Sequence, residues 1–315
     1  MIPIHNYDNG IFAIDAQYKR PLCAAIHFVI DNGRAAIIDT CHNPSVERTV
    51  QAVAQLGIQR EAVDYICLTH VHLDHAGGAG ALMREFSEAR LIVHPRGARH
   101  MVDPTQLMAG VKAVYGDAEA ERLYGELLPV PEERVVAATD EMPLKLGNRE
   151  LRCFDTPGHA RHHLCFHDPV ANAVFTGDVF GASYHELDVD GRQSVIVISS
   201  PVQFDPQAMR DSIRRILALR PDVLYLTHFS QLREPAARAD DLYRLIDAYV
   251  AIAEQAGSDE EGRCQRIADG LWRLFDAEAQ RLGWALSHEA LRKLLKSDVE
   301  LNAQGLDVWL KARAK

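Results

Sequence analysis

The segment Thr69-His70-Val71-His72-Leu73-Asp74-His75-Ala76-Gly77-Gly78 places three histidines and an aspartate directly after the apolar run at residues 65–68. A short apolar run of β-forming residues predicts a strand. In an extended backbone the two-residue period sends His70, His72 and Asp74 to one side, and a turn after them brings His75 into the same space. Because imidazole and carboxylate groups bind metal ions, we expect a metal site at this strand end.

Three later segments also place a histidine or an aspartate after a predicted strand. His159 lies in the turn Thr156-Pro157-Gly158-His159, which follows the run at residues 150–154. Asp178 follows residues 173–175, and His228 follows residues 223–226. Packing does not require ligand-type residues at four separate strand ends, so we interpret these segments as parts of one metal centre.

Strand and helix patterns alternate along most of the chain, which predicts an α/β layered fold. Further strands are expected at residues 11–14, 25–30, 35–39, 91–94 and 163–166, and Asp31-Asn32-Gly33 predicts a tight hairpin. Helices are expected at residues 45–56 with Ser45 as the cap, at residues 77–86, and within residues 103–133, which either cover the core or form a lid.

The chain after residue 235 has a helical pattern. Apolar stripes at residues 242–250 and 264–282 predict two helices, and shorter helices are expected to begin at Ser287 and at Ser297, the latter with Glu300 in a capping box. We therefore predict a catalytic domain at residues 1–234 and a helical extension at residues 235–315. We interpret the extension as a bundle packed on the first domain; self-association or shaping of a substrate pocket is the alternative.

Charge and composition narrow the classes of partner. The 315 residues include 34 Lys and Arg against 44 Asp and Glu, a net charge of -10, which disfavours nucleic-acid or anionic membrane surfaces as partners. The N-terminal residues lack a secretory pattern and no apolar run is long enough to span a bilayer, so we expect a cytoplasmic protein. The six cysteines form no CxxC pair and are expected to be buried, reduced thiols.

Taken in order, these segments resemble the metallo-β-lactamase-fold hydrolase superfamily over residues 7–230. Its motifs are a HxHxDH element, a later His in a TPGH turn, an Asp in a TGD segment and a final His after a strand. The full HxHxDH and the TPGH turn resemble the glyoxalase II-like, lactonase-like and nuclease branches. Residues 94–100, 158–163 and 200–206 resemble a poorly characterised archaeal and bacterial subgroup. The resemblance implies an αβ/βα four-layer sandwich with added C-terminal helices.

The resemblance also implies a ligand set and a chemistry. It implies a first divalent ion on His70, His72 and His159, a second on Asp74, His75 and His228, and Asp178 as the bridging ligand. Asp74 and Asp178 would be catalytic, because their charge tunes a hydroxide that bridges the ions and attacks a small-molecule ester, thioester or lactone. Zinc is the expected ion, with iron or manganese as alternatives.

Several alternatives remain open. One is a single ion on His70, His72, His159 and Asp178, and another is a mononuclear iron oxygenase that uses a subset of the ligands and resembles the persulfide dioxygenases. A phosphodiesterase and a non-catalytic sensor are further alternatives. The flavin-linked iron branch is disfavoured by His72, where that branch has an acidic residue. The glycines at 77, 78 and 80 do not complete a GxGxxG motif, and neither GxSxG nor a P-loop motif occurs.

Other residues have weaker signals. His163 is expected to be either a hydrogen-bond partner of a ligand or a structural residue at a strand start, and Asp39 resembles a position that supports the metal-binding loop. His100, Tyr115 and Tyr184 are candidates for substrate contact or for ordinary packing. We expect a small-molecule substrate and a homodimer formed through the helical extension.

Overall fold

The computed structural model describes residues 1–313, and these residues form two compact units. The first, which we call the sheet unit, comprises Met1–Asp155, His162–Gly177 and Pro221–Gln231. The second, the helical unit, comprises Thr156–Arg161, Asp178–Arg220 and the chain from Leu232 onward. The chain therefore crosses between the units several times. The predicted boundary at residue 234, between a catalytic domain and a helical extension, stays a prediction. Residues 314–315 of the predicted extension lie outside the described residues.

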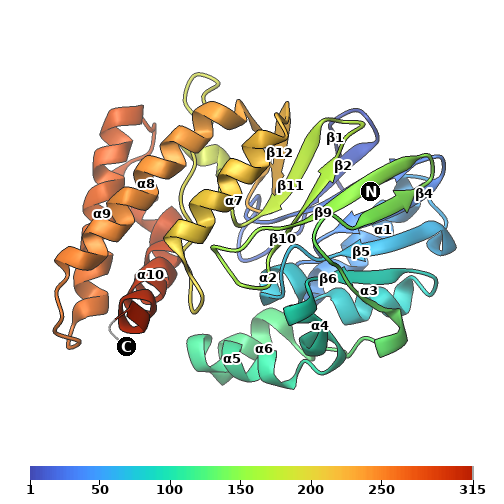
Figure 1. Cartoon of the computed structure of the whole chain (residues 1–315), viewed down its shortest axis with the longest axis horizontal. Helices are drawn as coiled ribbons and strands as arrows, with labels where there is room; N and C mark the ends of the chain where they lie inside the picture. The colour runs from blue at the N-terminus through green and yellow to red at the C-terminus, as the bar shows by residue number, and fades with distance from the viewer. Residues whose placement is uncertain (314–315) are drawn as a thin grey trace. The chain divides into compact units, whose positions relative to one another are not determined.

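The sheet unit contains two sheets (Figure 1). The seven-stranded sheet has the order β1 (His5–Asn6), β2 (Ile11–Asp15), β3 (Ala25–Asp31), β4 (Arg34–Ile38), β5 (Val63–Cys67), β6 (Arg90–Val93) and β7 (Val135–Ala137). Its first four strands are antiparallel, and β4 to β7 are parallel. Because parallel strands end at the same sheet edge, the segments after β4 and β5 emerge side by side.

The six-stranded sheet has the order β13 (Ser230–Arg233), β12 (Val223–Leu226), β11 (Ala173–Gly177), β10 (Leu164–Asp168), β9 (Arg149–Asp155) and β8 (Pro143–Leu146). The β11–β12 pairing is parallel, and β8, β9, β10 and β11 pair antiparallel. Asp178 and His228 follow the two parallel strands, so both segments leave the sheet in the same direction.

Local sequence explains the hairpin between β3 and β4. Asp31 pairs with Arg34, and Asn32 and Gly33 between them have φ angles of 47° and 74°. Both values fit a tight two-residue turn, for which Asn-Gly is the favoured pair. The predicted hairpin is therefore confirmed.

Two apolar cores stabilise the sheet unit. The first contains side chains of both sheets, among them Ile38, Cys67, Phe166 and Phe175, and lies between the two sheets. The second lies on the other face of the seven-stranded sheet and includes Phe86. The helices of this unit are α1 (Val46–Gln55), α2 (Leu73–Ala76), α3 (Ala79–Glu85), α4 (Pro95–Val102), α5 (Thr105–Tyr115) and α6 (Asp117–Tyr124), with 3₁₀ turns at Asn43–Ser45, Arg60–Ala62 and Glu132–Arg134.

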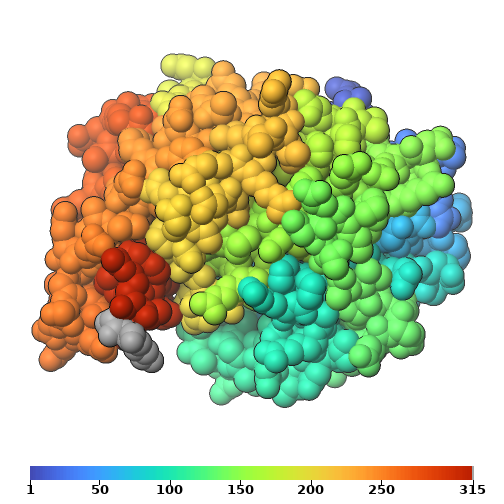
Figure 2. All heavy atoms as spheres, in the orientation of Figure 1, coloured from blue at the N-terminus to red at the C-terminus, as the bar shows by residue number. Residues whose placement is uncertain are grey.

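The helical unit contains α7 (Pro206–Ala218), α8 (Pro235–Gln255), α9 (Arg263–Leu282), α10 (His288–Arg313) and a 3₁₀ turn at His185–Leu187. The last three helices pack against one another (Figure 1), and they form the orange and red surface in Figure 2. Tyr249, Phe275 and Leu306, one from each helix, are fully buried. The predicted α/β fold with two sheets and added C-terminal helices is confirmed.

Three local predictions are wrong. Ser45 does not cap α1 with its side chain, because its hydroxyl donates to the Ala16 carbonyl instead. His288–Arg313 forms one helix rather than two, so Ser297 lies inside α10 and no helix begins there. The third concerns Asp74, described below. Strands β1, β7, β8 and β13 and helices α4 and α7 were not predicted.

Two broader expectations concern the cysteines and the membrane. All six cysteines are free thiols, and five of them are buried, as expected. Burial raises the pKa of the Cys153 thiol to about 12, so this side chain stays protonated. Within residues 1–313, no helix combines the length and the apolar character that crossing a membrane requires.

Candidate metal centre

The HxHxDH element is not extended throughout. Strand β5 ends at Cys67 and the backbone of His72 is extended, but Asp74 and His75 lie in the short helix α2. The prediction that the strand period places Asp74 beside His70 and His72 is therefore wrong. The cause is that the residues after His72 form a helical turn. In a helix consecutive side chains are rotated by about 100°, whereas in a strand they alternate between the two faces.

Asp74, His75 and His228 come together in the sheet unit. One ligand atom from each lies within 4.8 Å of the others. The Nε2 of His228 lies 3.5 Å from Asp74 Oδ2, and the Nε2 of His75 lies 4.0 Å from Asp74 Oδ1. Two ligand atoms about 2.1 Å from a tetrahedral ion lie about 3.4 Å apart. The donor set and its spacing therefore fit a divalent ion.

Hydrogen bonds fix the tautomers of these imidazoles. The Nδ1 of His228 lies 2.7 Å from the carbonyl oxygen of Cys23, which can only accept, so this Nδ1 carries the proton. The Nδ1 of His75 donates to Asp39 Oδ2 at 2.8 Å. Each ring consequently has its lone pair on Nε2, the atom that lies near Asp74.

Asp39 connects the strand ends that hold these ligands. It follows β4 with a φ of 58° and is 1% exposed. Its carboxylate accepts from the backbone N–H of Thr69 at 2.8 Å, from the Thr69 hydroxyl, and from the Thr227 hydroxyl at 2.7 Å, besides His75. Thr69 precedes His70 and Thr227 precedes His228. The expectation that Asp39 supports the metal-binding loop agrees with this geometry.

His70 and His72 lie in a wider group of histidines in the sheet unit. Their ring centroids are 4.5 Å apart, and the His70 ring is 3.9 Å from that of His75. The Thr69 hydroxyl donates to Asp39, so it accepts from His70 Nδ1 at 3.2 Å, which leaves the lone pair of His70 on Nε2.

His162 and His163 belong to this group, although the sequence indicated His162 only as part of the motif at residues 158–163. His163 is fully buried, with its ring 5.2 Å from that of His70, and His162 lies 5.5 Å from His72. The available signal was the histidine-rich run itself. His163 thus packs beside a predicted ligand at the start of β10, consistent with a supporting role.

His159 and Asp178 lie together in the helical unit. The Nε2 of His159 is 3.6 Å from Asp178 Oδ2, and both residues are buried. The Nδ1 of His159 donates to the carbonyl of Ile198 at 3.2 Å, so its lone pair is on Nε2, toward the carboxylate. This pair also has the chemistry and the spacing of two ligands of one ion. The assignment of His159 to an ion with His70 and His72 stays a prediction.

The turn that holds His159 depends on Gly158. This glycine has a φ of 140°, and a Cβ there would lie 2.3 Å from the Cα of Met209 in α7. Its carbonyl accepts from the backbone N–H of Asp205, whose side chain caps α7. The two segments at residues 158–163 and 200–206, which the sequence indicated as motifs, therefore contact each other.

The remaining candidates have other partners. Tyr184 is 4% exposed and its hydroxyl donates to Asp298 at 2.9 Å, and Tyr115 lies under the ammonium of Lys19 at 4.8 Å. His100 lies on α4, where partial burial lowers the pKa of its imidazole. None of these contacts assigns a role in substrate binding.

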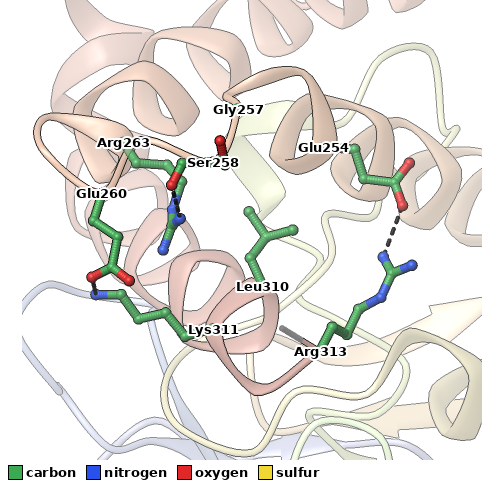
Figure 3. Close-up of a pocket in the computed structure, with 8 residues that line it drawn as sticks. All are labelled: Glu254, Gly257, Ser258, Glu260, Arg263, Leu310, Lys311 and Arg313. Carbon is green, nitrogen blue, oxygen red and sulfur yellow. Dashed lines mark hydrogen bonds and ion pairs between the residues drawn. The ribbon is translucent and has the colours of Figure 1, made fainter. Parts of the chain in front are cut away.

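A pocket of about 710 Å³ in the helical unit contains none of the predicted ligands (Figure 3). On opposite sides of Leu310, Glu254 pairs with Arg313 and Glu260 pairs with Lys311. The third basic side chain of the lining, Arg263, pairs with Asp307 outside it. The chemistry predicted from the sequence lies with the histidine and aspartate groups described above.

Comparison with known proteins agrees with this reading of the residues. A family model described as the metallo-beta-lactamase superfamily matches residues 24–228. Metallo-beta-lactamase fold-containing protein ST1585 of Sulfurisphaera tokodaii is 27% identical over 176 residues, 53% of this chain and 61% of that protein. Hydroxyacylglutathione hydrolase of Maricaulis maris is 27% identical over 152 residues, 48% of this chain and 45% of that protein.

Acyl-coenzyme A thioesterase MBLAC2 of Gallus gallus is 31% identical over 123 residues, 35% of this chain and 39% of that protein. The chain thus spans about half the length of the curated relatives that it matches. The crystal structure of ST1585 has a TM-score of 0.66 at 22% identity and covers 94% of this chain and 98% of that one, which shows a shared fold. From the family model and the shared fold, the chain belongs to the metallo-beta-lactamase superfamily, a superfamily of metallo-hydrolases.

Proposed function

We propose that this protein is a metal-dependent hydrolase of a small-molecule ester, thioester or lactone. Its ligands would be His70, His72 and His159 for one ion and Asp74, His75 and His228 for a second, with Asp178 bridging. Zinc is the proposed ion. The observation that carries the proposal is the group of Asp74, His75 and His228, because its donor atoms have ligand spacing and its imidazoles are already oriented.

The chain's own residues have distinct tasks in this proposal. When bound, divalent ions supply Lewis-acid stabilisation of developing charge and lower the pKa of water. Asp74 and Asp178 offset part of the ions' positive charge, and Asp39 holds His75 in one tautomer. The side chain of Asp74 is 27% exposed whereas that of His75 is fully buried. Substrate would therefore approach from the side of Asp74.

The choice of substrate class rests on two considerations. Two relatives are named hydroxyacylglutathione hydrolase and acyl-coenzyme A thioesterase, and these names denote hydrolysis of acyl derivatives of small molecules. The net charge of -10 disfavours a polyanionic nucleic acid, because the protein's own field would repel it. We therefore rank thioesters, esters and lactones above phosphodiesters.

The experiment is metal analysis combined with a substrate panel on one sample. We expect about two equivalents of zinc per chain and hydrolysis of a generic thioester or lactone, which chelation abolishes and added zinc restores. Cleavage of phosphodiesters alone would contradict the substrate class. One iron per chain with oxygen consumption on a thiol substrate would contradict hydrolysis, and metal binding without any turnover would indicate a sensor.

A further inference from the structure

One face of α10 contacts the loop that follows Asp178 in the helical unit. Asp298, Asn302 and Gly305 are spaced by four and three residues, so they lie on the same side of the helix. Asp298 accepts from the Tyr184 hydroxyl at 2.9 Å. A Cβ on Gly305 would lie 1.6 Å from the Ser199 carbonyl oxygen, so only glycine permits this approach. This face therefore determines where the loop lies.

The side-chain amide of Asn302 forms two hydrogen bonds with the backbone of the loop. Its Oδ1 accepts from the backbone N–H of Ser199 at 2.7 Å, and its Nδ2 donates to the Val197 carbonyl at 3.0 Å. Asn302 is 2% exposed, so both bonds are shielded from water.

The carbonyl that shares a peptide bond with the Ser199 N–H points to the opposite side, because this bond is planar and trans. That carbonyl belongs to Ile198, and it accepts from His159 Nδ1 at 3.2 Å. By holding Val197 and Ser199, the Asn302 amide therefore fixes the acceptor that selects the tautomer and the ring orientation of His159. The Tyr249 hydroxyl strengthens the arrangement, because it also donates to the Val197 carbonyl, at 3.2 Å.

We propose that Asn302 is a positioning residue for His159, so that the C-terminal helix α10 tunes metal binding through the Ile198 carbonyl. The inference rests on the proposed function insofar as His159 is taken to be a metal ligand. Acceptors that orient a ligating histidine change metal affinity about 10- to 100-fold when they are lost. A similar loss is expected when the group that holds the acceptor is removed.

The test is zinc affinity of the full-length protein, measured by competition with a chromophoric chelator. Asn302→Ala removes the acceptor of the Ser199 N–H and one of the two donors to the Val197 carbonyl, and we expect zinc affinity to fall about 10- to 100-fold. Leu295→Ala is the matched control, because Leu295 is a fully buried residue of α10 with an apolar side chain that cannot hydrogen-bond to the loop. It should change zinc affinity less than threefold.

Two further measurements separate positioning from general loss of structure. The visible spectrum of the cobalt-substituted protein reports ligand geometry, and it should change in Asn302→Ala but not in Leu295→Ala. In a His159→Ala background, Asn302→Ala should have no additional effect on zinc affinity, because the ligand through which it acts is gone. If Asn302→Ala does not fold, Asn302→Asp replaces it, since it keeps the acceptor for Ser199 and loses the donor to Val197.

The outcomes distinguish this inference from the proposed function. Unchanged zinc affinity and an unchanged cobalt spectrum in a folded Asn302 variant would overturn the inference, even if the wild-type protein is a hydrolase. Equal losses in Asn302→Ala and Leu295→Ala would also overturn it. A wild-type protein that binds zinc but hydrolyses nothing would contradict the proposed function, and the affinity test of Asn302 would still apply. A wild-type protein that binds no metal would overturn both.

Discussion

The predicted ligands of the sheet unit and those of the helical unit are oriented by the same device, but the groups that do it differ in charge. In the sheet unit His75 Nδ1 donates to the Asp39 carboxylate, whereas in the helical unit His159 Nδ1 donates to the Ile198 carbonyl. A charged acceptor makes the opposite ring nitrogen more basic than a neutral acceptor does. We therefore expect His75 to be the stronger donor to a metal ion.

The two acceptors also differ in what holds them. Asp39 follows β4 and bonds to Thr69 after β5 and to Thr227 after β12, so three strand ends support it. Ile198 lies in a loop whose position depends on Asn302 of α10. Substitutions far from the ligands should therefore affect His159 more than His75.

The largest expected effect is the loss of a carboxylate ligand from either unit. Asp74→Ala and Asp178→Ala should each lower kcat/KM by about 10³-fold or more, because several kcal/mol of transition-state stabilisation depend on correctly held ions. If Asp178 bridges two ions, its loss should reduce the zinc content of the purified protein more than the loss of Asp74 does. Rates on a thioester and zinc content by mass spectrometry check both statements.

The control is Asp190→Asn, which changes an exposed turn residue of the helical unit whose φ of 50° asparagine tolerates. It should leave both rate and zinc content unchanged. Equal zinc content in Asp74→Ala and Asp178→Ala would argue against a bridging role and would place the two carboxylates in equivalent positions.

Acid should destabilise the protein through a histidine of the sheet unit. Burial lowers the pKa of His27 from 6.5 to about 4. The unfolded chain therefore takes up a proton below about pH 6.5 that the folded protein does not take up until about pH 4. Protonation of this histidine consequently favours the unfolded chain more and more across that window as the pH falls. The difference amounts to about 3 kcal/mol at pH 4.

Urea unfolding of the metal-free protein at pH 7 and pH 4 measures this effect. His27→Phe keeps an aromatic ring beside Phe175 and Tyr225 and removes the titration, so its loss of stability on acidification should be smaller by about 3 kcal/mol. An identical pH dependence in the variant would show that folding does not lower the pKa of His27.

The comparison of the two acceptors is tested most directly by removing the charge of Asp39. Asp39→Asn keeps the shape of the side chain but replaces an acceptor of His75 by a neutral amide, and we expect zinc affinity to fall about 10- to 100-fold. Thr227→Val removes one hydrogen bond to Asp39 and leaves its charge, so it should change the affinity less than threefold. If both variants lose affinity equally, the position of Asp39 matters rather than its charge.

Much of the candidate site could be predicted, because its residues follow strands. His159, Asp178 and His228 lie within four residues of the ends of β9, β11 and β12, and apolar β-forming runs make those strands easy to recognise in the sequence. The Asn-Gly hairpin between β3 and β4 could be predicted for a similar reason, since only few residue pairs favour that turn.

What could not be predicted depends on tertiary contacts. Asp74 was expected on an extended backbone, but the period of a few residues does not reveal where a strand gives way to a helical turn. Ser297 has the local features of a helix cap, yet it lies inside α10 because residues before it continue the helix. Asn302 is an ordinary helix residue in sequence, and only the fold brings its amide to residues 197–199.

The smallest expected effects concern the two sides of α10. Tyr184→Phe removes the hydrogen bond to Asp298 on the side that faces the loop, and it should lower the free energy of unfolding by about 1 kcal/mol. Glu300 is exposed on the same helix, and Glu300→Ala should change the free energy of unfolding by no more than about 0.5 kcal/mol, because it lies within the helix and completes no capping box. Urea unfolding of both variants provides the measurement. A cost of 1 kcal/mol or more for Glu300→Ala would indicate that a helix begins at Ser297 after all. Asp298 and Asn302 would then lie in the first turns of a separate helix, and the continuous α10 that orients His159 through Asn302 would not exist.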